Sequence, residues 1–239
     1  MEPQITPISA DDSFSFGCHS KVSCFNACCR DLNQFLTPYE ILRLKTHLKL
    51  DAETFLARYT QSHTGPSTGL PIITLKPGPG KDLPCPFVSS AGCRVYPDRP
   101  ASCRIYPLMR GVQRDAQSGA LVEHYAVLRE PHCRGFEQPA NQTVAQWVAD
   151  QGLAPYNTMN DRMAAIIATK ARHQTGPLDL RRSQLFRLAL YDLDNFHRHV
   201  FDKGLLAGFP LKDGRLESAR RDQTALLDIA FTWITQSLF

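Results

Sequence analysis

Residues 16–38 read FGCHSKVSCFNACCRDLNQFLTP and place four cysteines within twelve residues: Cys18, Cys24, Cys28 and Cys29. The stretch then runs into a helix start at Thr37 and Pro38. A single cysteine is often no more than a small buried apolar residue. Four of them so close together indicate a shared ligand.

Four further cysteines follow, at Cys85, Cys93, Cys103 and Cys133. The separations are x5, x3 and zero in the first group, then x7 and x9, with x29 before the last cysteine. Zinc ribbons and thioredoxin-like redox sites contain Cys-x2-Cys, and a radical S-adenosylmethionine site contains Cys-x3-Cys-x2-Cys. None of these spacings occurs here. Thiolates suit zinc, copper(I) and iron–sulfur clusters, so the kind of centre stays open.

The adjacent pair Cys28 and Cys29 points in two directions, because the side chains of neighbouring residues diverge from the backbone. The two thiols would not normally reach one small ion together. We expect one of them to serve one centre and the other to serve a second metal, the edge of a larger cluster, or the core.

Composition and charge exclude several classes of protein. The chain has 239 residues, of which 43% are apolar, so a hydrophobic core is sufficient without disulfides. The opening MEPQITPISADD has no basic and apolar leader, and no run is long enough to span a membrane. We therefore expect a soluble cytoplasmic protein whose thiols stay reduced, with a disulfide framework as the alternative. The net charge of +4 forms no basic stripe, which predicts neither nucleic-acid nor membrane partners.

A second cysteine-rich stretch covers residues 85–108 and repeats Cys-Arg-x-Tyr-Pro at 93–97 and 103–107. Arginines can stabilise a negatively charged thiolate centre by contacting the ligands from behind, as a second layer around the metal. We expect this role for Arg99 and Arg104. The tyrosines of the repeat are expected to pack. His19 and His132 adjoin cysteines and are weaker ligand candidates.

The fold class predicted is mainly α, with a small loop-rich α+β cysteine-cluster region containing a β-hairpin, and a C-terminal helical bundle. A helix should begin at Thr37, with Glu40 completing a capping box, and a second at Asp51. A strand is expected over 70–75, and a hairpin over 107–128 around the turn DAQSG. Further helices are expected over 143–151, 157–172, 180–203 and 213–238. The domains expected are 1–138, which binds metal, and 139–239, which is helical.

The cysteine-rich half resembles the YkgJ-type cysteine-cluster family, described as a zinc- or iron-chelating domain and named for a CxxCxxCC motif. The matching stretches are ACC at 27–29, CPF at 85–87, GCRVY at 92–96, RPASCRIYP at 99–107, and Cys133. The resemblance covers residues 14–137, although x5 and x3 stand where the motif has x2 and x2. Some members are described as iron–sulfur oxidoreductases. Flagellin lysine N-methylases are similar through the same domain, which implies methyl transfer from S-adenosylmethionine.

All eight cysteines are candidate metal ligands, enough for two centres of four thiolates or for one centre with four to spare. The first hypothesis is one principal iron–sulfur cluster with a redox role and an unknown redox or protein partner. Its ligands would come from Cys24, Cys28 or Cys29, Cys85, Cys93 and Cys103. The alternatives are a structural zinc site in an interaction protein and, less strongly, an S-adenosylmethionine-dependent lysine methyltransferase.

Overall fold

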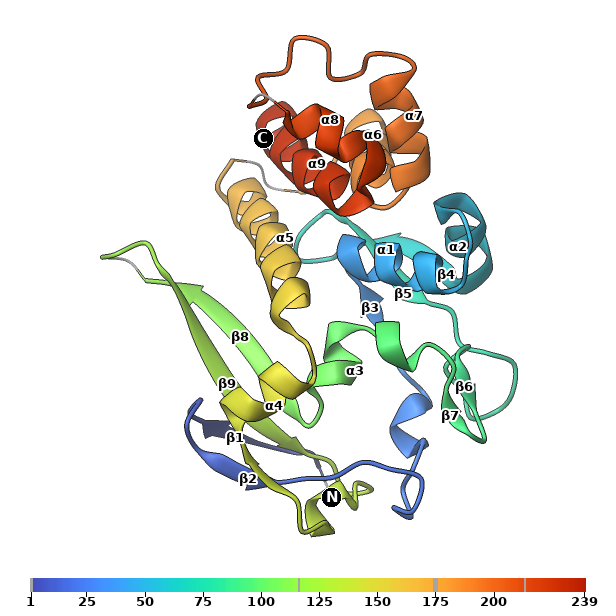
Figure 1. Ribbon diagram of the computed structural model, residues 1–239, viewed down its shortest axis with the longest axis vertical. Helices are drawn as coiled ribbons and strands as arrows, with labels where there is room; N and C mark the ends of the chain where they lie inside the picture. Colours follow the sequence, from blue (N-terminus) through green and yellow to red (C-terminus); the bar gives the residue numbers. More distant parts are fainter. Residues whose placement is uncertain (1, 116, 174–175, 213) are drawn as a thin grey trace. The chain divides into compact units, whose positions relative to one another are not determined.

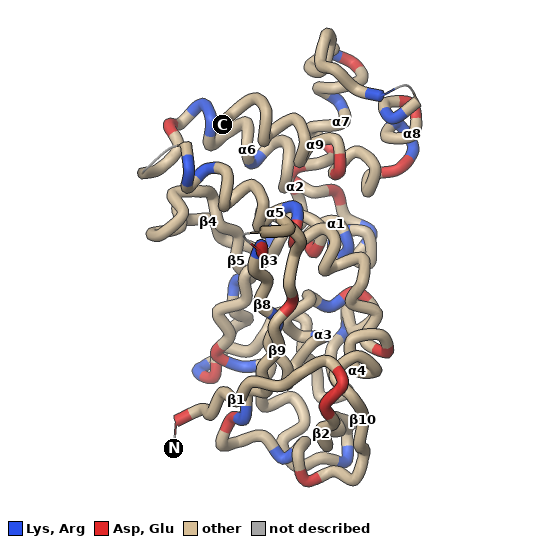
Figure 2. Tube along the Cα trace, turned by 90° about the vertical axis from the view of Figure 1, so that its left-hand side faces the viewer, with Lys and Arg blue, Asp and Glu red and all other residues tan. Residues whose placement is uncertain are grey.

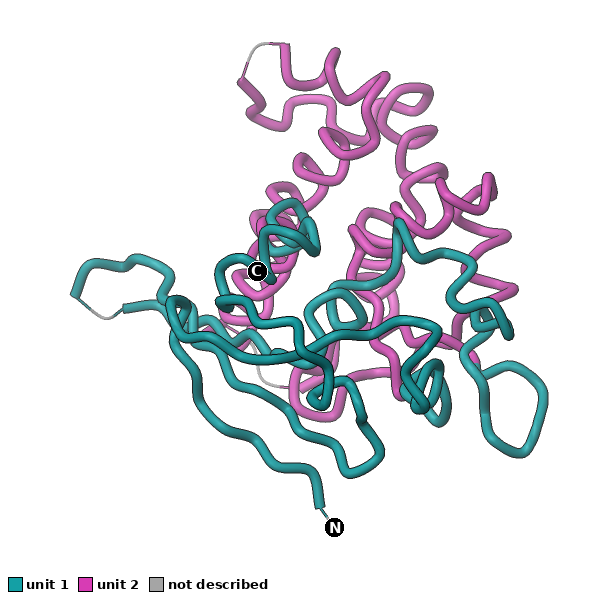
Figure 3. Tube along the Cα trace, turned by 60° about the horizontal axis from the view of Figure 1, so that its bottom comes forward, with its two compact units in different colours: residues 1–32, 77–157 teal, residues 33–76, 158–239 magenta. Residues whose placement is uncertain are grey.

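The computed structural model describes residues 2–115, 117–173, 176–212 and 214–239 (Figure 1). The chain forms two compact units, each built from two separate segments (Figure 3). Unit 1 contains residues 1–32 and 77–157, and unit 2 contains residues 33–76 and 158–239. All eight cysteines belong to unit 1. The expected boundary at 138/139 falls inside unit 1, and the division into domains 1–138 and 139–239 stays a prediction.

Unit 1 contains a three-stranded antiparallel sheet in the order β1-β9-β8. Its strands are β1 (Gln4–Ile8), β8 (Leu108–Arg114) and β9 (Leu121–Arg129). The predicted hairpin is confirmed by the pairing of β8 with β9, from Leu108 opposite Val127 to Arg114 opposite Leu121. Ala116 of its turn lies outside the described residues. The edge strand β1 was not expected, because its sequence lacks the alternation of apolar and polar residues that is typical of a strand. Its position depends on pairing with β9.

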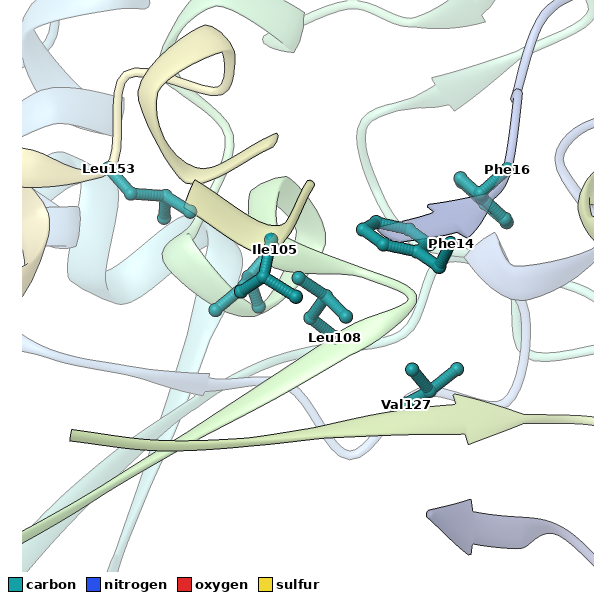
Figure 4. Close-up of a cluster of buried hydrophobic side chains, with 7 residues drawn as sticks. Phe14, Phe16, Ile105, Leu108, Val127 and Leu153 are labelled. Carbon is teal, nitrogen blue, oxygen red and sulfur yellow. The ribbon is translucent and has the colours of Figure 1, made fainter. Parts of the chain in front are cut away.

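A small aromatic and aliphatic core lies behind this sheet (Figure 4). Its buried members are Phe14, Phe16, Ile105, Leu108, Val127, Val144 and Leu153. They come from β2 (Ser13–Ser15), α3 (Ala101–Ile105), β8, β9, α4 (Val144–Asp150) and the adjoining loops. β2 pairs with β10 (Asn141–Thr143), and Thr143 caps α4 in a capping box with Gln146. This core fixes the ends of the segments that carry Cys18, Cys103 and Cys133.

The segments between these elements form short pieces of structure. They are η1 (Ala27–Cys29), β6 (Val88–Ser89), β7 (Gly92–Cys93), η2 (Tyr96–Asp98) and η3 (Gly135–Glu137). None of these pieces exceeds three residues. Their positions therefore depend more on hydrogen bonds between segments than on regular secondary structure within each segment.

Unit 2 contains a second small sheet in the order β3-β5-β4, all antiparallel. The strands are β3 (Phe35–Leu36), β4 (Thr60–Thr64) and β5 (Pro71–Leu75). Two helices precede β4, α1 (Pro38–His47) and α2 (Ala52–Tyr59). Both predicted helix starts are confirmed. The amide of Thr37 donates to Oε2 of Glu40 over 2.7 Å, and the carboxylate of Asp51 accepts from the amide of Thr54 over 2.7 Å.

The C-terminal part is helical, as expected, but two long helices are each divided. The helices are α5 (Ala154–His173), α6 (Leu180–Leu190), α7 (Leu193–Phe201), α8 (Arg215–Arg221) and α9 (Gln223–Leu238). The single helices predicted over 180–203 and 213–238 are wrong, because Asp192 and Asp222 each cap a new helix with the side chain. α9 packs on α6, α7 and α8 through buried residues that include Leu226, Leu227, Ala230 and Ile234.

Charged residues of both signs are interspersed along the trace (Figure 2). The described helices include none with the length and apolar character needed to cross a membrane.

Candidate metal centre

The N-terminal cysteine segment, at Cys29, pairs with the second cysteine-rich stretch, which carries Cys85, Cys93 and Cys103. The amide of Cys85 donates to the carbonyl of Cys29 over 2.8 Å, and Arg30 and Pro84 form an antiparallel bridge beside it. Cys93 is brought in by the β6–β7 pairing, in which it lies opposite Val88. We name these four residues the first thiol group.

The members of the first thiol group interact electrostatically. The pKa of Cys29 is raised by its hydrogen bond with Cys28 and by burial, then by the charges of Cys28, Cys85 and Cys103. Burial also raises the pKa of Cys85, and the neighbouring Cys93 adds to the effect. These interactions link Cys29 with Cys85 and Cys103, and Cys85 with Cys93.

The other four thiols, Cys18, Cys24, Cys28 and Cys133, form a second thiol group. The amide of Arg134 donates to Sγ of Cys24 over 3.1 Å, and the amide of Gly17 donates to the carbonyl of Gly135 over 3.0 Å. Burial raises the pKa of Cys18 to about 11, and the charges of Cys28, Cys24 and Cys133 contribute to the rise. The N-terminal segment and the 130–137 turn are therefore joined around these sulfurs.

Backbone amides also point at several sulfurs. Burial raises the pKa values of the Cys93 and Cys133 thiols. The backbone amides of Val95 and Gly135 hydrogen-bond to these sulfurs and partly offset the rise in pKa. Each of these amides stands two residues after its cysteine. Cys85 receives such bonds from Phe87 and Val88. Amide donors favour the thiolate form, which is the form that binds metals.

The donor set therefore fits a thiophilic metal. All eight cysteines are free thiols, so the structure does not support the alternative of a disulfide framework. Within the ranges that the structure describes, no group of three cysteine, histidine or carboxylate side chains is placed so that it could hold a metal ion. Thiols lose their protons when they bind a metal, and coupled folding draws them together.

Cys28 and Cys29 form the junction between the two thiol groups. The hydrogen bond from the Cys29 thiol lowers the pKa of Cys28 to about 7 and raises that of Cys29. Cys28 interacts with Cys18, whereas Cys29 interacts with Cys85 and Cys103. The expected divergence of the adjacent side chains is wrong, because the two thiols are hydrogen-bonded to each other; the residues differ in the other cysteines with which they interact.

A comparison with known families matches residues 17–134 to the family described as "CxxCxxCC: Putative zinc- or iron-chelating domain". Residues 17–134 belong to the CxxCxxCC family. The matched span contains all eight cysteines and also the inserted residues 33–76 of unit 2. No curated protein and no solved structure matches the chain. Chelation of zinc or iron is accordingly the function that the family description supports.

Arg99 and Arg104 of the CxxCxxCC domain are both buried, but they act differently. Arg99 stacks over the ring of Tyr96 at 3.8 Å, and its positive charge acts on the thiols of Cys18, Cys93 and Cys103. The guanidinium of Arg104 donates to the carbonyls of Arg99, Pro97 and Gln151, over 3.0 Å to Arg99 and 2.8 Å to Gln151. The charge of Arg99 acts on thiols, whereas the described bonds of Arg104 hold the loop. The second-layer roles predicted for Arg99 and Arg104 stay predictions.

Tyr106 and Glu130 are parts of the CxxCxxCC site that sequence reasoning missed. Tyr106 was expected to pack, and its ring does lie 5.8 Å from that of Phe16. Its hydroxyl also donates to Oε2 of Glu130 over 2.9 Å and takes part in a hydrogen bond with Cys133. The repeated Cys-Arg-x-Tyr-Pro was the available signal, because it marks Tyr106 as part of the cysteine stretch.

The two histidines beside cysteines have other contacts. Nδ1 of His19 accepts from the amide of Lys21 over 3.3 Å. Nε2 of His132 lies 3.7 Å from Oε2 of Glu130. Neither contact brings an imidazole to a sulfur.

Proposed function

We propose that the first thiol group of the CxxCxxCC domain holds an iron–sulfur cluster and that the protein has a redox role. The proposal rests on Cys29, Cys85, Cys93 and Cys103, which lie on separate segments linked by the Cys29–Cys85 backbone hydrogen bond and by electrostatic interactions, without any Cys-x2-Cys pair. Four thiolates are the usual ligand set of a cubane cluster, whereas single zinc ions usually use a short paired spacing.

This ligand set refines the one favoured from the sequence. Of Cys28 and Cys29, the second is the member that interacts with Cys85 and Cys103. Cys24 was included in the favoured set, but its sulfur accepts from Arg134 and belongs to the second thiol group. Four thiols remain, the number that one cluster needs.

The protein surroundings suit a negatively charged centre. When bound, the cluster supplies one-electron transfer. The amides of Phe87, Val88 and Val95 bond to sulfurs of this group and stabilise negative charge there. The positive charge of Arg99 also favours negative charge on Cys93 and Cys103. Such contacts set the reduction potential of thiolate-held clusters.

Structural zinc is the second candidate, favoured by the short pieces of structure in this region. Elements of two or three residues give the loops little stability of their own, and a closed thiolate site would fix them. In that case the domain would bind a partner protein and carry out no redox chemistry.

The deciding experiment is anaerobic purification of the full chain, followed by an absorption spectrum and analysis for iron, zinc and labile sulfide. Broad absorbance near about 400 nm with matching iron and sulfide is the expected result. A colourless protein with stoichiometric zinc would replace the cluster by the zinc candidate. A protein without either metal would contradict both.

The methyltransferase reading, which came from the resemblance to flagellin lysine N-methylases, stays a prediction. A thermal shift of the metal-loaded protein with S-adenosylmethionine would support it, and the absence of a shift would remove its only support.

A further inference from the structure

We propose that a cavity between α2 and α7 of unit 2 binds a small molecule with an ammonium group at one end and a carboxylate group at the other. The two helices pack against each other within this unit (Figure 1). The cavity has a volume of about 620 Å³, within the range of about 300 to 1,000 Å³ that is typical of small-molecule sites. None of the described residues that line it is a cysteine, so the inference goes beyond the proposed function and does not depend on it.

Acidic side chains line the cavity where the two helices begin. Asp51 is the N-cap of α2 and Asp192 is the N-cap of α7, and Glu53 follows in the first turn of α2. Oδ2 of Asp194, in the first turn of α7, accepts a hydrogen bond from the amide of Ala52 over 2.6 Å. This bond joins the two helix starts. The end of the cavity at these starts is therefore negatively charged.

Arginine side chains line the same cavity farther along each helix. Arg58 lies five positions after Glu53 on α2, and Arg198 lies six positions after Asp192, the N-cap of α7. A helix rises about 1.5 Å per residue, so the acidic and basic positions are about 7.5 to 9 Å apart along the helix axes. Residues four apart on a helix can form an ion pair, but Ala57 occupies that position relative to Glu53. The opposite charges on α2 therefore stay separated along the cavity.

The two arginines have no carboxylate partner among the residues that the structure describes. The guanidinium of Arg58 lies over the ring of the next residue, 5.1 Å from the ring centroid. That of Arg198 donates to the side-chain oxygen of Asn195. Asp194, four positions before Arg198, accepts instead from Nζ of Lys45. Both arginines are exposed, so their guanidinium groups are available to a carboxylate, with which arginine can form two parallel hydrogen bonds.

The arrangement selects for a ligand with charges of both signs. An ammonium group fits the end lined by Glu53 and Asp192, and a carboxylate fits the end lined by Arg58 and Arg198. The short side chain of Ala57 leaves room for an aliphatic chain between the two ends. A dication would bring a positive charge to the arginines, and a dicarboxylate would bring a negative charge to the acidic end. Like charges brought together in this way reduce affinity.

The test is isothermal titration calorimetry of the full chain with 6-aminohexanoate. Hexylamine and hexanoate, which each carry one of its two charges, are the comparison ligands. Six bonds join the nitrogen of 6-aminohexanoate to its carboxyl carbon and span about 7 Å when extended, close to the separation of charges in the cavity. We expect it to bind about 10-fold more tightly than either comparison ligand. The preference should diminish at high salt, because the arginines are exposed.

Variants assign the two ends of the ligand. Arg58→Gln and Glu53→Gln should each weaken binding of 6-aminohexanoate by about 3-fold to 5-fold, because each removes one exposed charge contact. Arg58→Gln should not weaken binding of hexylamine, and Glu53→Gln should not weaken binding of hexanoate. Arg221→Gln, an exposed change at the end of α8 and outside the cavity, should bind 6-aminohexanoate as the wild-type protein does.

The ligand series and the variants can each overturn the proposal. Equal affinity of the wild-type protein for the three compounds, or no measurable binding of 6-aminohexanoate, would contradict it. The same loss of affinity in Arg58→Gln and Arg221→Gln would also contradict it, by indicating a general effect of net charge. If a variant does not fold, judged by circular dichroism, the ligand series on the wild-type protein still decides. Failure of these tests would leave the iron–sulfur proposal unaffected, because that proposal depends on iron and sulfide analysis.

Discussion

The backbone amide of Arg134 donates a hydrogen bond to the sulfur of Cys24 over 3.1 Å, although the two residues are 110 positions apart in the chain. This bond connects the N-terminal cysteine segment to the turn that carries Cys133. The fold therefore brings these two cysteine-bearing segments together by backbone hydrogen bonding.

Replacement of Cys93 by serine should remove the iron–sulfur chromophore. Serine oxygen is a poor ligand for iron in a thiolate cluster, so we expect loss of most of the absorbance near about 400 nm and of the bound iron and sulfide. Absorption spectra and metal analysis of anaerobically purified protein measure both. Ser90→Ala, an exposed change in the turn between β6 and β7, is the matched control and should retain the chromophore. A Cys93→Ser protein with full iron content would contradict the ligand assignment.

Tyr106→Phe should weaken metal binding by the cysteine-rich region without unfolding the protein. The phenylalanine ring keeps the contact with Phe16, but the bonds to Glu130 and Cys133 are lost. Loss of such an outer contact typically lowers metal affinity by about 10-fold to 100-fold. Competition between Co(II) and a chelator measures the affinity. Tyr125→Phe removes a comparable bond, from Tyr125 to Glu123 over 2.7 Å, away from the thiols. Equal affinity in the two variants would show that the Tyr106 hydroxyl does not support the site.

Gly135→Ala should destabilise unit 1. A Cβ atom at this position would overlap the ring of Phe16, which is itself buried in the core behind the sheet. Forced repacking of a filled core costs roughly 1 to 3 kcal/mol. The midpoint of urea unfolding measures the loss. Gly111→Ala, on β8, serves as the control because the nearest atom to its added Cβ is 4.0 Å away. The same midpoint for both variants would refute the steric argument.

Asp194→Asn should destabilise unit 2 and change its response to acid. Asp194 on α7 pairs with the buried Lys45 at 3.0 Å and accepts from the amide of Ala52 over 2.6 Å. Removing the carboxylate leaves the ammonium group of Lys45 without its charge partner, at a cost of about 1.5 to 3 kcal/mol at neutral pH. Urea unfolding at several pH values measures the difference from the wild-type protein.

The pH dependence follows from the pKa of Asp194. Burial alone raises this pKa, but hydrogen bonds from Ala52, Gln223 and Lys45 more than offset burial and lower it below its ordinary value. A carboxylate whose pKa is lower in the folded state stabilises the protein fully above about pH 4. This contribution is lost as the pH falls through the folded-state pKa. The wild-type protein should therefore lose its advantage over Asp194→Asn in acid. Asp202→Asn, an exposed change at the end of α7, should follow the wild-type curve.

The features predicted correctly from the sequence depend on nearby residues. The starts of α1 and α2 follow from Pro38, Glu40 and Asp51, which act within one helical turn. The β8–β9 hairpin follows from two strand-forming runs around a short turn. The misjudged helices also have a local cause, since Asp192 and Asp222 are strong N-cap residues inside otherwise regular apolar patterns. Because the apolar periodicity continues past both aspartates, it did not reveal that a new helix starts at each of them.

The grouping of the thiols required contacts that no local pattern contains. The sequence predicted that the Cys28 and Cys29 side chains diverge, whereas their thiols are hydrogen-bonded to each other. It also offered no means of matching Cys24 with the segment around Cys133. That match depends on the pairing of Gly17 with Gly135 and on the Arg134 amide. The part played by Tyr106 has the same origin, because Glu130 reaches its hydroxyl only after β8 and β9 have paired.

The interleaved segments give a bound metal a further effect, on the entropy of the unfolded chain. Residues 33–76 leave unit 1 after Leu32 and return at Pro77, as an insertion. Cys29 precedes the exit and Cys85 follows the return, so a metal held by both would tie the two ends of the insertion together. Closing a loop of this length restricts the unfolded chain by about 4 kcal/mol on a simple chain-entropy estimate. Metal removal would therefore stabilise the unfolded chain, and α1, α2 and their small sheet would melt more easily although they contain no cysteine.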